Sequence, residues 1–344
     1  MSEEAYAEVN AALAESHVLP RYRNFAEAAA KFAEVTEDFC KASGQSDDGA
    51  LQAGFDEVMD AWMGVQHLRF GPAELFLRAY RIAFWPQAQG RFVELVGDLL
   101  SQNDPARLTE ESFGTAGVAV QGLPAAEVLI YSEAALDGQR QGEVGRCNLL
   151  RAIGRNLSVI ASDIRRDWEE GAEPFLATLK QPGPDNPYFA THQDATLVFF
   201  KSLHDQLQLI ADAKLKPVVG VSAETAEPKL VETPLAKRAL RNILLNLEAL
   251  QALYHGEDGS GLSQLVAASG SDADLDPLMR KAFDQTLANA RSIDQPLAEA
   301  VADPANRPKV EKLLTQVLAL KQIVKTRVAQ ALEVSVGFNA LDGD

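Results

Sequence analysis

The sequence lacks the short patterns by which most enzyme classes are recognised. It contains no HExxH helix for zinc, no GxSxG turn for a serine nucleophile, no P-loop, and no GxGxxG sequence followed by a strand pattern. Its histidines are scattered, and no two stand four residues apart, so no helical face offers a zinc-binding pair. They are His17, His67, His192, His204 and His255. Motifs alone therefore indicate no catalytic residue.

Long apolar runs and an excess of positive charge are also absent. No stretch approaches the roughly 18 consecutive apolar residues of a membrane span, and the opening MSEEAYAEVN lacks the basic and apolar parts of a signal peptide. Taken alone, this indicates the cytoplasm. With Lys+Arg 32 against Asp+Glu 49, the net charge of −17 repels nucleic acid and anionic membrane, so neither is an expected partner.

Cysteine is scarce, with Cys40 and Cys147 as the two instances. In an oxidising compartment they could form one disulfide, but they stand 107 positions apart and the sequence does not show whether they meet. Two buried free thiols are the default expectation. Neither cysteine has a neighbouring histidine that would activate it as a nucleophile.

Helical periodicity, by contrast, runs through nearly the whole chain, while strand alternation is almost absent. A hydrophobic content of 47% supplies ample core for a helical protein of 344 residues. The predicted helices cover Glu3–Ser16, Arg21–Lys41, Gly49–Leu68, Ala73–Ala83, Gln87–Ser101, Gly117–Leu136, Glu143–Leu179, Thr191–Ala213, Pro234–Tyr254, Ser260–Ala268, Leu275–Ser292 and Pro304–Val334. A long loop is predicted over Lys216–Pro234. The last helix shows a core-facing stripe of Val310, Leu313, Leu314, Val317, Leu320, Val324 and Val328.

The segment QPGPDNPYF, Gln181–Phe189, interrupts this pattern with three prolines and a glycine. It is the best candidate for a domain boundary, which divides the chain into residues 1–183 and 184–344. Each part holds enough long helices for a four-helix bundle. The predicted fold is therefore all-α, with two four-helix-bundle-like domains packed together.

Glu127 is the only charged residue between Gly117 and Ser132, in a run that is otherwise suited to a protein interior. A buried carboxylate must take up a proton, pair with a cation or hold a metal, because burying it unpaired costs several kcal/mol. The alternative is that Pro124 opens a helix and Glu127 lies in its first turn, where a negative charge suits the helix dipole.

Cations that could pair with Glu127 lie upstream, at Arg69, Arg78 and Arg81. Trp62, Gln66 and Arg69 are spaced so that they share one helical face. Arginine suits a buried carboxylate because its planar fork can bind both oxygens. We therefore predict that Glu127 is buried and paired with an arginine of this block. The alternative is an amphipathic helix whose arginines reach to water.

These segments carry a resemblance to imelysin-like proteins, the group also called peptidase family M75. The matching pieces are spread in order over the chain and include VQHLRFGP, RIAFWP, VQGLPAAE, RNILLNLEAL and the ending VGFNALDGD. The hallmark of the family is GxHxxE. Here Gly122 and Glu127 occupy its ends, but Pro124 stands at the histidine position, so the chain resembles a branch with GLPALE-like sequences.

The resemblance implies a fold of two helical bundles with the site between them, and a place in the periplasm or cell envelope, often as a lipoprotein. It also implies a link to iron uptake and to iron-uptake proteins of the envelope as partners. The implied peptidase activity conflicts with the loss of the motif histidine. We therefore expect no zinc-dependent peptidase activity.

The ending GFNALDGD places Asp342 and Asp344 within a few residues, and carboxylate oxygens suit a hard cation such as ferric iron. A frayed acidic tail is the alternative. We predict that family-matching segments of both halves converge on one polar cleft. The predicted site residues are Gln66, Arg69, Arg81, Trp85, Gly122, Pro124, Glu127, Asn242 and Asp342, with Glu127 and Asp342 as metal ligands.

Three functions follow from these observations. The first is a non-catalytic envelope protein associated with iron uptake that binds a metal or a small ligand between its bundles, with iron or another cation as the candidate cofactor. The second is a metallopeptidase of family M75. The third is an interaction module that binds an acidic partner or a polysaccharide through an arginine-lined cleft around Arg69, Arg78 and Arg81.

Overall fold

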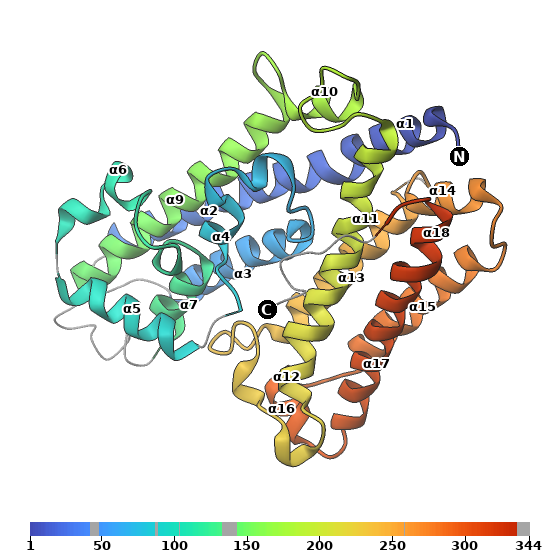
Figure 1. The fold of residues 1–344 in the computed structure, drawn as a ribbon. Coiled ribbons are helices and arrows are strands. Elements are labelled where there is room, and N and C mark those ends of the chain that lie inside the picture. Colours follow the sequence, from blue (N-terminus) through green and yellow to red (C-terminus); the bar gives the residue numbers. More distant parts are fainter. Residues whose placement is uncertain (42–47, 87–88, 103, 133–142, 258, 336–344) are drawn as a thin grey trace.

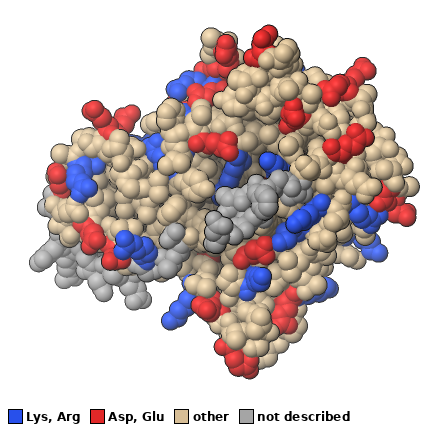
Figure 2. Space-filling view, viewed as in Figure 1, with Lys and Arg blue, Asp and Glu red and all other residues tan. Residues whose placement is uncertain are grey.

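The computed structural model describes residues 1–41, 48–86, 89–102, 104–132, 143–257 and 259–335. Every regular element within these ranges is helical, and none is a strand, so the all-α prediction is confirmed. Figure 1 shows the first half of the chain on the left and top, and the second half on the right and bottom. Acidic side chains are spread over the face visible in Figure 2 rather than gathered in one patch. None of the described helices is long and apolar enough to cross a membrane.

The first helical rod is longer than predicted. Helix α1 (Glu3–Ala12) continues through a π-helical segment, η1 (Leu13–Val18), into α2 (Leu19–Lys41). The sequence prediction separated two helices at this point. Pro20 lacks an amide hydrogen and cannot fit a regular interior turn, and the wider π turn just before it keeps the rod continuous.

Helix α2 packs between α3 (Asp48–Val65) and α9 (Glu143–Glu169) to form the core of the first half. Phe25, Phe32, Phe55 and Trp62 are fully buried there. The prediction of one helix from Glu143 to Leu179 is wrong, because the chain turns at Gly171 (φ +103°) and starts α10 (Phe175–Lys180) after Pro174. Only glycine adopts such a φ without cost.

The segment between α3 and α9 contains short helices. The predicted helix over Ala73–Ala83 is broken, since Phe76 and Leu77 adopt left-handed φ angles of 55° and 56°. The predicted helix from Gly117 to Leu136 starts later, at Leu123. The elements here are η2 (Gly71–Ala73), η3 (Leu75–Leu77), α4 (Arg78–Ile82), α5 (Gln89–Gln102), η4 (Pro105–Leu108), α6 (Glu110–Phe113), η5 (Val118–Val120) and α7 (Leu123–Tyr131).

The second half is built around α11, α13, α15 and α17. In the predicted stripe of the last long helix, Leu314 is only partly buried, whereas the other six side chains are in the core. The elements are α11 (His192–Gln208), η7 (Leu209–Leu215), α12 (Lys216–Val219), η8 (Ala223–Thr225), η9 (Pro228–Leu230), α13 (Ala239–His255), α14 (Leu262–Ser269), α15 (Leu275–Arg291), α16 (Leu297–Ala302), α17 (Arg307–Ile323), η10 (Val324–Val328) and α18 (Ala329–Ala331).

The two halves meet along three pairs of helices. Helix α3 packs against α13, and α1 packs against α11 and α14 (Figure 1). The proposed boundary between residues 183 and 184 stays a prediction. Together these contacts place the end of α3 against α11, η7 and α13, where the polar side chains described below converge.

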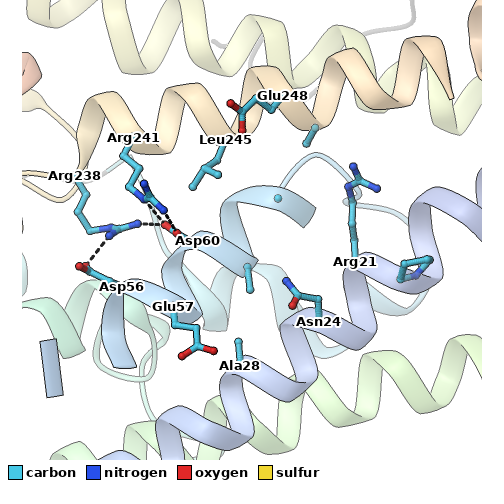
Figure 3. A pocket seen from close by; sticks show the side chains of 14 residues that line it. Arg21, Asn24, Ala28, Asp56, Glu57, Asp60, Arg238, Arg241, Leu245 and Glu248 are labelled. Atoms are coloured by element: carbon cyan, nitrogen blue, oxygen red, sulfur yellow. Dashed lines mark hydrogen bonds and ion pairs between the residues drawn. The ribbon is translucent and has the colours of Figure 1, made fainter. Parts of the chain in front are cut away.

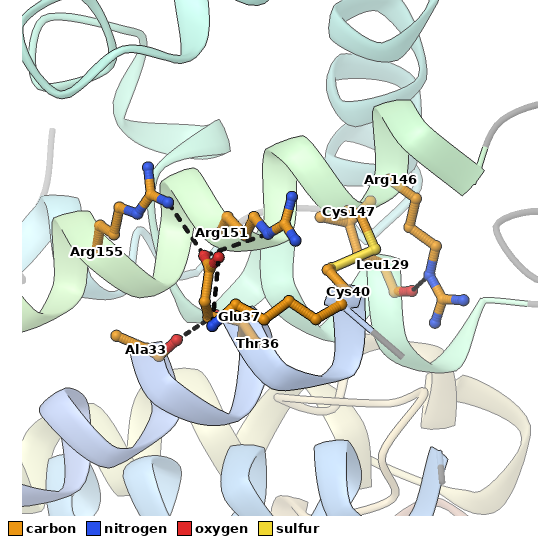
Figure 4. Close-up of a disulfide and its surroundings, with 10 residues drawn as sticks. Ala33, Thr36, Glu37, Cys40, Leu129, Arg146, Cys147, Arg151 and Arg155 are labelled. Carbon is orange, nitrogen blue, oxygen red and sulfur yellow. Dashed lines mark hydrogen bonds and ion pairs between the residues drawn. A yellow bond between two sulfur atoms is a disulfide. The ribbon is translucent and has the colours of Figure 1, made fainter. Parts of the chain in front are cut away.

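Cys40, near the end of α2, and Cys147, in the first turns of α9, form a disulfide (Figure 4). The default expectation of two free thiols is therefore wrong. The antiparallel packing of α2 on α9 brings the two Cα atoms to 5.4 Å, within the usual disulfide range. Beside the bond, Glu37 accepts from Arg155 at 3.0 Å and pairs with Arg151 at 3.2 Å.

Candidate functional site

A buried polar cluster lies where α3 meets the second half, and Lys214 is at its centre. The Lys214 Nζ donates to Glu232 Oε2 at 2.7 Å, to Asn246 Oδ1 at 2.8 Å and to Gln66 Oε1 at 3.0 Å. These bonds use all three of its donors. The Nζ also lies 5.7 Å from the centroid of the Trp85 ring, a distance suited to a cation–π contact.

Amides from two helices, α11 and α13, complete this Lys214 cluster. Gln206 on α11 donates to Gln66 Oε1 at 2.9 Å, Asn242 on α13 donates to Glu232 Oε2 at 2.9 Å, and Asn246 donates to the Met63 backbone oxygen at 2.8 Å. All of these polar side chains are buried. Burial lowers the pKa of Lys214, and the adjacent Glu232 carboxylate opposes that shift.

The cluster brings predicted site residues together with residues that the sequence prediction missed. Gln66 and Asn242 were predicted, whereas Lys214 and Glu232 were not. A signal was present: Asn242 and Asn246 stand one turn apart in the apolar run ILLNLEAL, and buried amides need polar partners. This pattern predicts that the two amides have buried polar partners, but it does not identify the partner residues.

A cavity of about 750 Å³ opens beside the cluster, between the segment from His67 to Pro86 and helix α11. The half-buried Arg69 is one of the residues that line this cavity, and its Nε donates to the Gln66 backbone oxygen at 3.2 Å. Among the described residues, neither terminal nitrogen of Arg69 has a hydrogen-bond or ion-pair partner. Burial lowers the pKa of the guanidinium. The walls are largely apolar and include Phe70, Leu77, Tyr80, Trp85, Val198 and Leu209.

Glu127 on α7 is buried, as predicted, with 1% of its surface exposed. Its Oε1 accepts from the backbone N–H groups of Leu235 and Ala236, both at 2.9 Å. These residues lie between Thr233 and Lys237, which have left-handed φ angles of 49° and 56°. Glu127 of the first half is thus hydrogen-bonded to a strained loop of the second half. This loop directly follows Glu232 in the chain.

The predicted ion pair between Glu127 and an upstream arginine is wrong for the described residues. Arg78 donates to Asp167 at 2.7 Å and to the Pro72 backbone oxygen at 3.0 Å. Arg81 donates to the side-chain oxygens of Gln121 at 2.7 Å and Asn156 at 2.9 Å. It lines a separate cavity against α9, so it does not join the Lys214 cluster.

Gly122 and Pro124 position α7. A Cβ on Gly122 would lie 2.2 Å from the Ile82 backbone oxygen, so only glycine allows this close approach. Pro124 lies in the first turn of α7, where its missing N–H costs nothing. With Trp85, Glu127 and Glu232 it lines a second, much smaller cavity.

The structure also joins two histidines that stand 50 positions apart. His17, in the π segment η1, and His67, just after α3, lie with their Nε2 atoms 2.8 Å apart, and both are buried. Burial lowers the pKa of each ring well below its usual value. Spacing on one helix could not reveal a pair formed by two separate elements.

No group of three or more His, Cys, Asp or Glu side chains that could hold a metal ion occurs within the described ranges. Glu127 Oε1 already accepts two N–H groups. Asp342, the second predicted metal ligand, and Asp344 lie outside the described residues.

On the far side of the α3–α13 contact lies an open groove of about 780 Å³, bounded by α2, α3 and α13 (Figure 3). Arg238 and Arg241 extend from α13 towards α3 and pair with Asp60, and Arg238 also pairs with Asp56 at 2.6 Å. We call these four residues the arginine clamp. Arg241 and Asp56 are largely exposed, with side-chain exposures of 57% and 47%.

Comparisons with known proteins agree with this architecture. The family model described as imelysin, peptidase M75, matches residues 18–324. An imelysin-like protein from Psychrobacter arcticum 273-4 has a similar structure, with a TM-score of 0.80, 19% identity, and coverage of 98% of each chain. A "putative iron-regulated protein A precursor" from Parabacteroides distasonis ATCC 8503 is also similar, with a TM-score of 0.78, 14% identity, and coverage of 95% of this chain and 96% of that one.

No curated protein matches the chain. The two structural similarities establish the fold alone, since both identities are under 25%. The family model covers most of the sequence, from the π segment of the first rod to the end of the last long helix. The chain belongs to the imelysin family.

Proposed function

We propose that the protein is a non-catalytic, iron-associated protein of the cell envelope that binds a small ligand in the cavity beside Arg69. The observation that carries the proposal is Arg69, which lines a cavity of ligand size and whose terminal guanidinium nitrogens are unpaired among the described residues. A cation held in a mostly apolar pocket is suited to bind and orient a ligand.

The Lys214 cluster supports the proposal because it makes the floor of the cavity rigid. Gln66 belongs to the cluster through its side chain and holds Arg69 through its backbone oxygen. Trp85 contacts Lys214 and also lines the cavity. Binding sites keep their geometry when surrounding side chains are fixed by hydrogen bonds of this kind.

Membership of the imelysin family and the name of the Parabacteroides protein support the association with iron and the envelope. A metal ion bound directly by Glu127 is not part of the proposal, because Oε1 already holds two backbone N–H groups of the loop. The arginine-lined cleft for an acidic partner loses support, because Arg78 and Arg81 bind groups of this chain.

The test is capture of the native ligand. The protein is isolated from the envelope fraction of iron-limited cells without chelators, and native mass spectrometry compares the parent with Arg69→Met and with Arg155→Met. Arg155 is a matched control, since it lies on α9 with 60% of its side chain exposed. The parent and the control should release the same small molecule, and Arg69→Met should release none.

Two results would refute the proposal. One is the same molecule released from the parent and from Arg69→Met. The other is cleavage of a casein substrate that a chelator abolishes and zinc restores, because that activity would make the protein a metallopeptidase.

A further inference from the structure

We infer that the ligand of this cavity is a small aromatic monocarboxylate, with its carboxylate on Arg69 and its ring against Trp85 and Tyr80. The inference rests on the proposed function and names the class of ligand. It depends on three features: the free hydrogen-bonding capacity of Arg69, the charge balance of the floor, and the composition of the walls.

The two terminal nitrogens of Arg69 form a planar fork that fits both oxygens of a carboxylate. Within the part of the chain that the structure describes, no side chain or backbone oxygen occupies this fork. This side chain is half-buried, and burial lowers the pKa of its guanidinium, so an anion that binds it would gain more free energy than at a fully exposed arginine.

The charges of the residues beside the cavity favour a ligand with one negative charge. Arg69 and Lys214 interact electrostatically with each other, and both interact with the buried carboxylate of Glu232. Lys214 is in direct contact with Glu232 at 2.7 Å, whereas Arg69 has no carboxylate in direct contact among the described residues. A monoanion would neutralise it.

The rim disfavours more highly charged anions. Its carboxylates are Glu74, which interacts with Lys201, and Asp205, which lies 2.9 Å from His204 Nδ1. A phosphate dianion would place one surplus negative charge near both. A single carboxylate matches the charge of Arg69 and adds less negative charge near Glu74 and Asp205 than a phosphate would, so the charges favour a carboxylate.

The walls favour a flat apolar body. Trp85, Tyr80 and Phe70 provide aromatic surface, and Leu77, Val198 and Leu209 provide aliphatic surface. Aromatic rings pack favourably by offset or edge-to-face contact. A ring carboxylate with an adjacent hydroxyl, such as salicylate, also offers two hard oxygens to iron, which connects the ligand class to the proposed iron association.

Binding is tested by saturation-transfer NMR on the whole protein with benzoate, salicylate and 2,3-dihydroxybenzoate as probes. Benzamide, which has the same shape as benzoate without its charge, and inorganic phosphate serve as comparison ligands. The three carboxylates should receive saturation from the protein and compete with one another, whereas benzamide should bind at least about tenfold more weakly.

Variants locate the binding site. Arg69→Met should weaken benzoate binding at least about tenfold, Arg69→Lys should fall between it and the parent, and Arg155→Met should leave binding unchanged. Thermal melting of each variant separates loss of binding from loss of folding. If Arg69→Met unfolds, Arg69→Lys and benzamide still test the charge requirement.

Three results would overturn the inference: no saturation transfer to any of the three carboxylates, equal binding of benzamide and benzoate, or binding of phosphate with benzoate inert. These failures are distinct from failure of the proposed function. A neutral native ligand that disappears with Arg69→Met would leave the proposed function standing and refute the aromatic carboxylate.

Discussion

Helices α3 and α13 are joined by two polar regions that use the same chemistry in different surroundings. The Lys214 cluster is excluded from water, with Lys214 and Glu232 exposing 1% and 5% of their side chains. The arginine clamp lies in an open groove, where the Arg241 side chain is 57% exposed (Figure 3). Both regions bind one half of the chain to the other.

This difference shows which polar contacts stabilise the interface between the two halves. In the buried cluster each charge depends on its protein partner, because no water can replace that partner. In the groove, water and salt compete at the exposed side chains of Arg241 and Asp56, so the exposed Arg241 pair contributes little, although Arg238 itself is only 6% exposed. The buried cluster therefore sets the relative position of the halves, and the clamp adds a smaller contribution.

The largest effect is expected from Lys214→Met. Removing the cation leaves Glu232 buried without a charge partner, which costs about 3–5 kcal/mol of unfolding free energy. Urea denaturation measures the change. The double variant Lys214→Met with Glu232→Gln should recover part of the loss, since it removes the unpaired charge. A single variant as stable as the parent would show that the cluster is not energetically important.

The buried histidine pair should make stability depend on acid. Because burial lowers the pKa of His17 and His67 in the folded state, the unfolded chain binds more protons below its own histidine pKa of about 6.5. Stability is therefore present above that pH and falls as the pH drops, by up to about 1.4 kcal/mol per pH unit for each ring. Urea denaturation between pH 7 and 5 measures the slope.

His67→Gln should reduce this slope, while His192→Gln serves as the control outside the pair. The Arg21 guanidinium also lowers the pKa of both rings, so it acts in the same direction as burial. A slope unchanged by His67→Gln would contradict the assignment.

Glu127→Ala tests the contact between the buried region and the loop. It removes a carboxylate that accepts two backbone N–H groups, and hydrogen bonds to a charged group contribute about 1.5–3 kcal/mol. We expect a loss in this range by urea denaturation, with faster hydrogen exchange at Leu235 and Ala236. Glu127→Gln keeps an oxygen acceptor and should lose less. Unchanged exchange at both amides would exclude Glu127 as the residue that holds the loop.

The smallest effect is expected from Arg241→Gln. The Arg241–Asp60 pair is largely exposed on the arginine side, and Asp60 keeps its contact with Arg238. The expected loss is about 0.2–1 kcal/mol and should shrink as salt is added. A loss as large as that of Lys214→Met would mean that exposure does not distinguish the two regions.

Long helices could be predicted from the sequence because one buried face repeats over many turns, as in the stripe from Val310 to Val328. Local breaks in the helices could not be predicted from the sequence. Phe76 and Leu77 have left-handed φ angles that bulky residues rarely adopt, so nothing in their chemistry announces the break. The π turn before Pro20 is a similar case, since proline usually predicts the end of a helix.

In the candidate site, the sequence could identify polar side chains that differ from the apolar residues around them in the chain. Glu127 and Gln66 stood out in this way, and the structure buries both. The partner of Glu127 could not be found, because backbone N–H groups have no sequence signature. Lys214 stands just beyond the predicted end of its helix at Ala213, and the His17–His67 pair forms only when two helices pack.

The disulfide bears on how the cavity is assembled. The Cys40–Cys147 bond closes a loop of 107 positions, and Gln66, Arg69 and Trp85 all lie within it. On the chain-entropy estimate, a cross-link across about 100 residues restricts the unfolded chain by about 4.7 kcal/mol. Oxidation of two thiols therefore stabilises the segment that supplies the first-half wall of the cavity. The stability of the cavity therefore depends on the redox environment, and it is greatest in a compartment where thiols are oxidised.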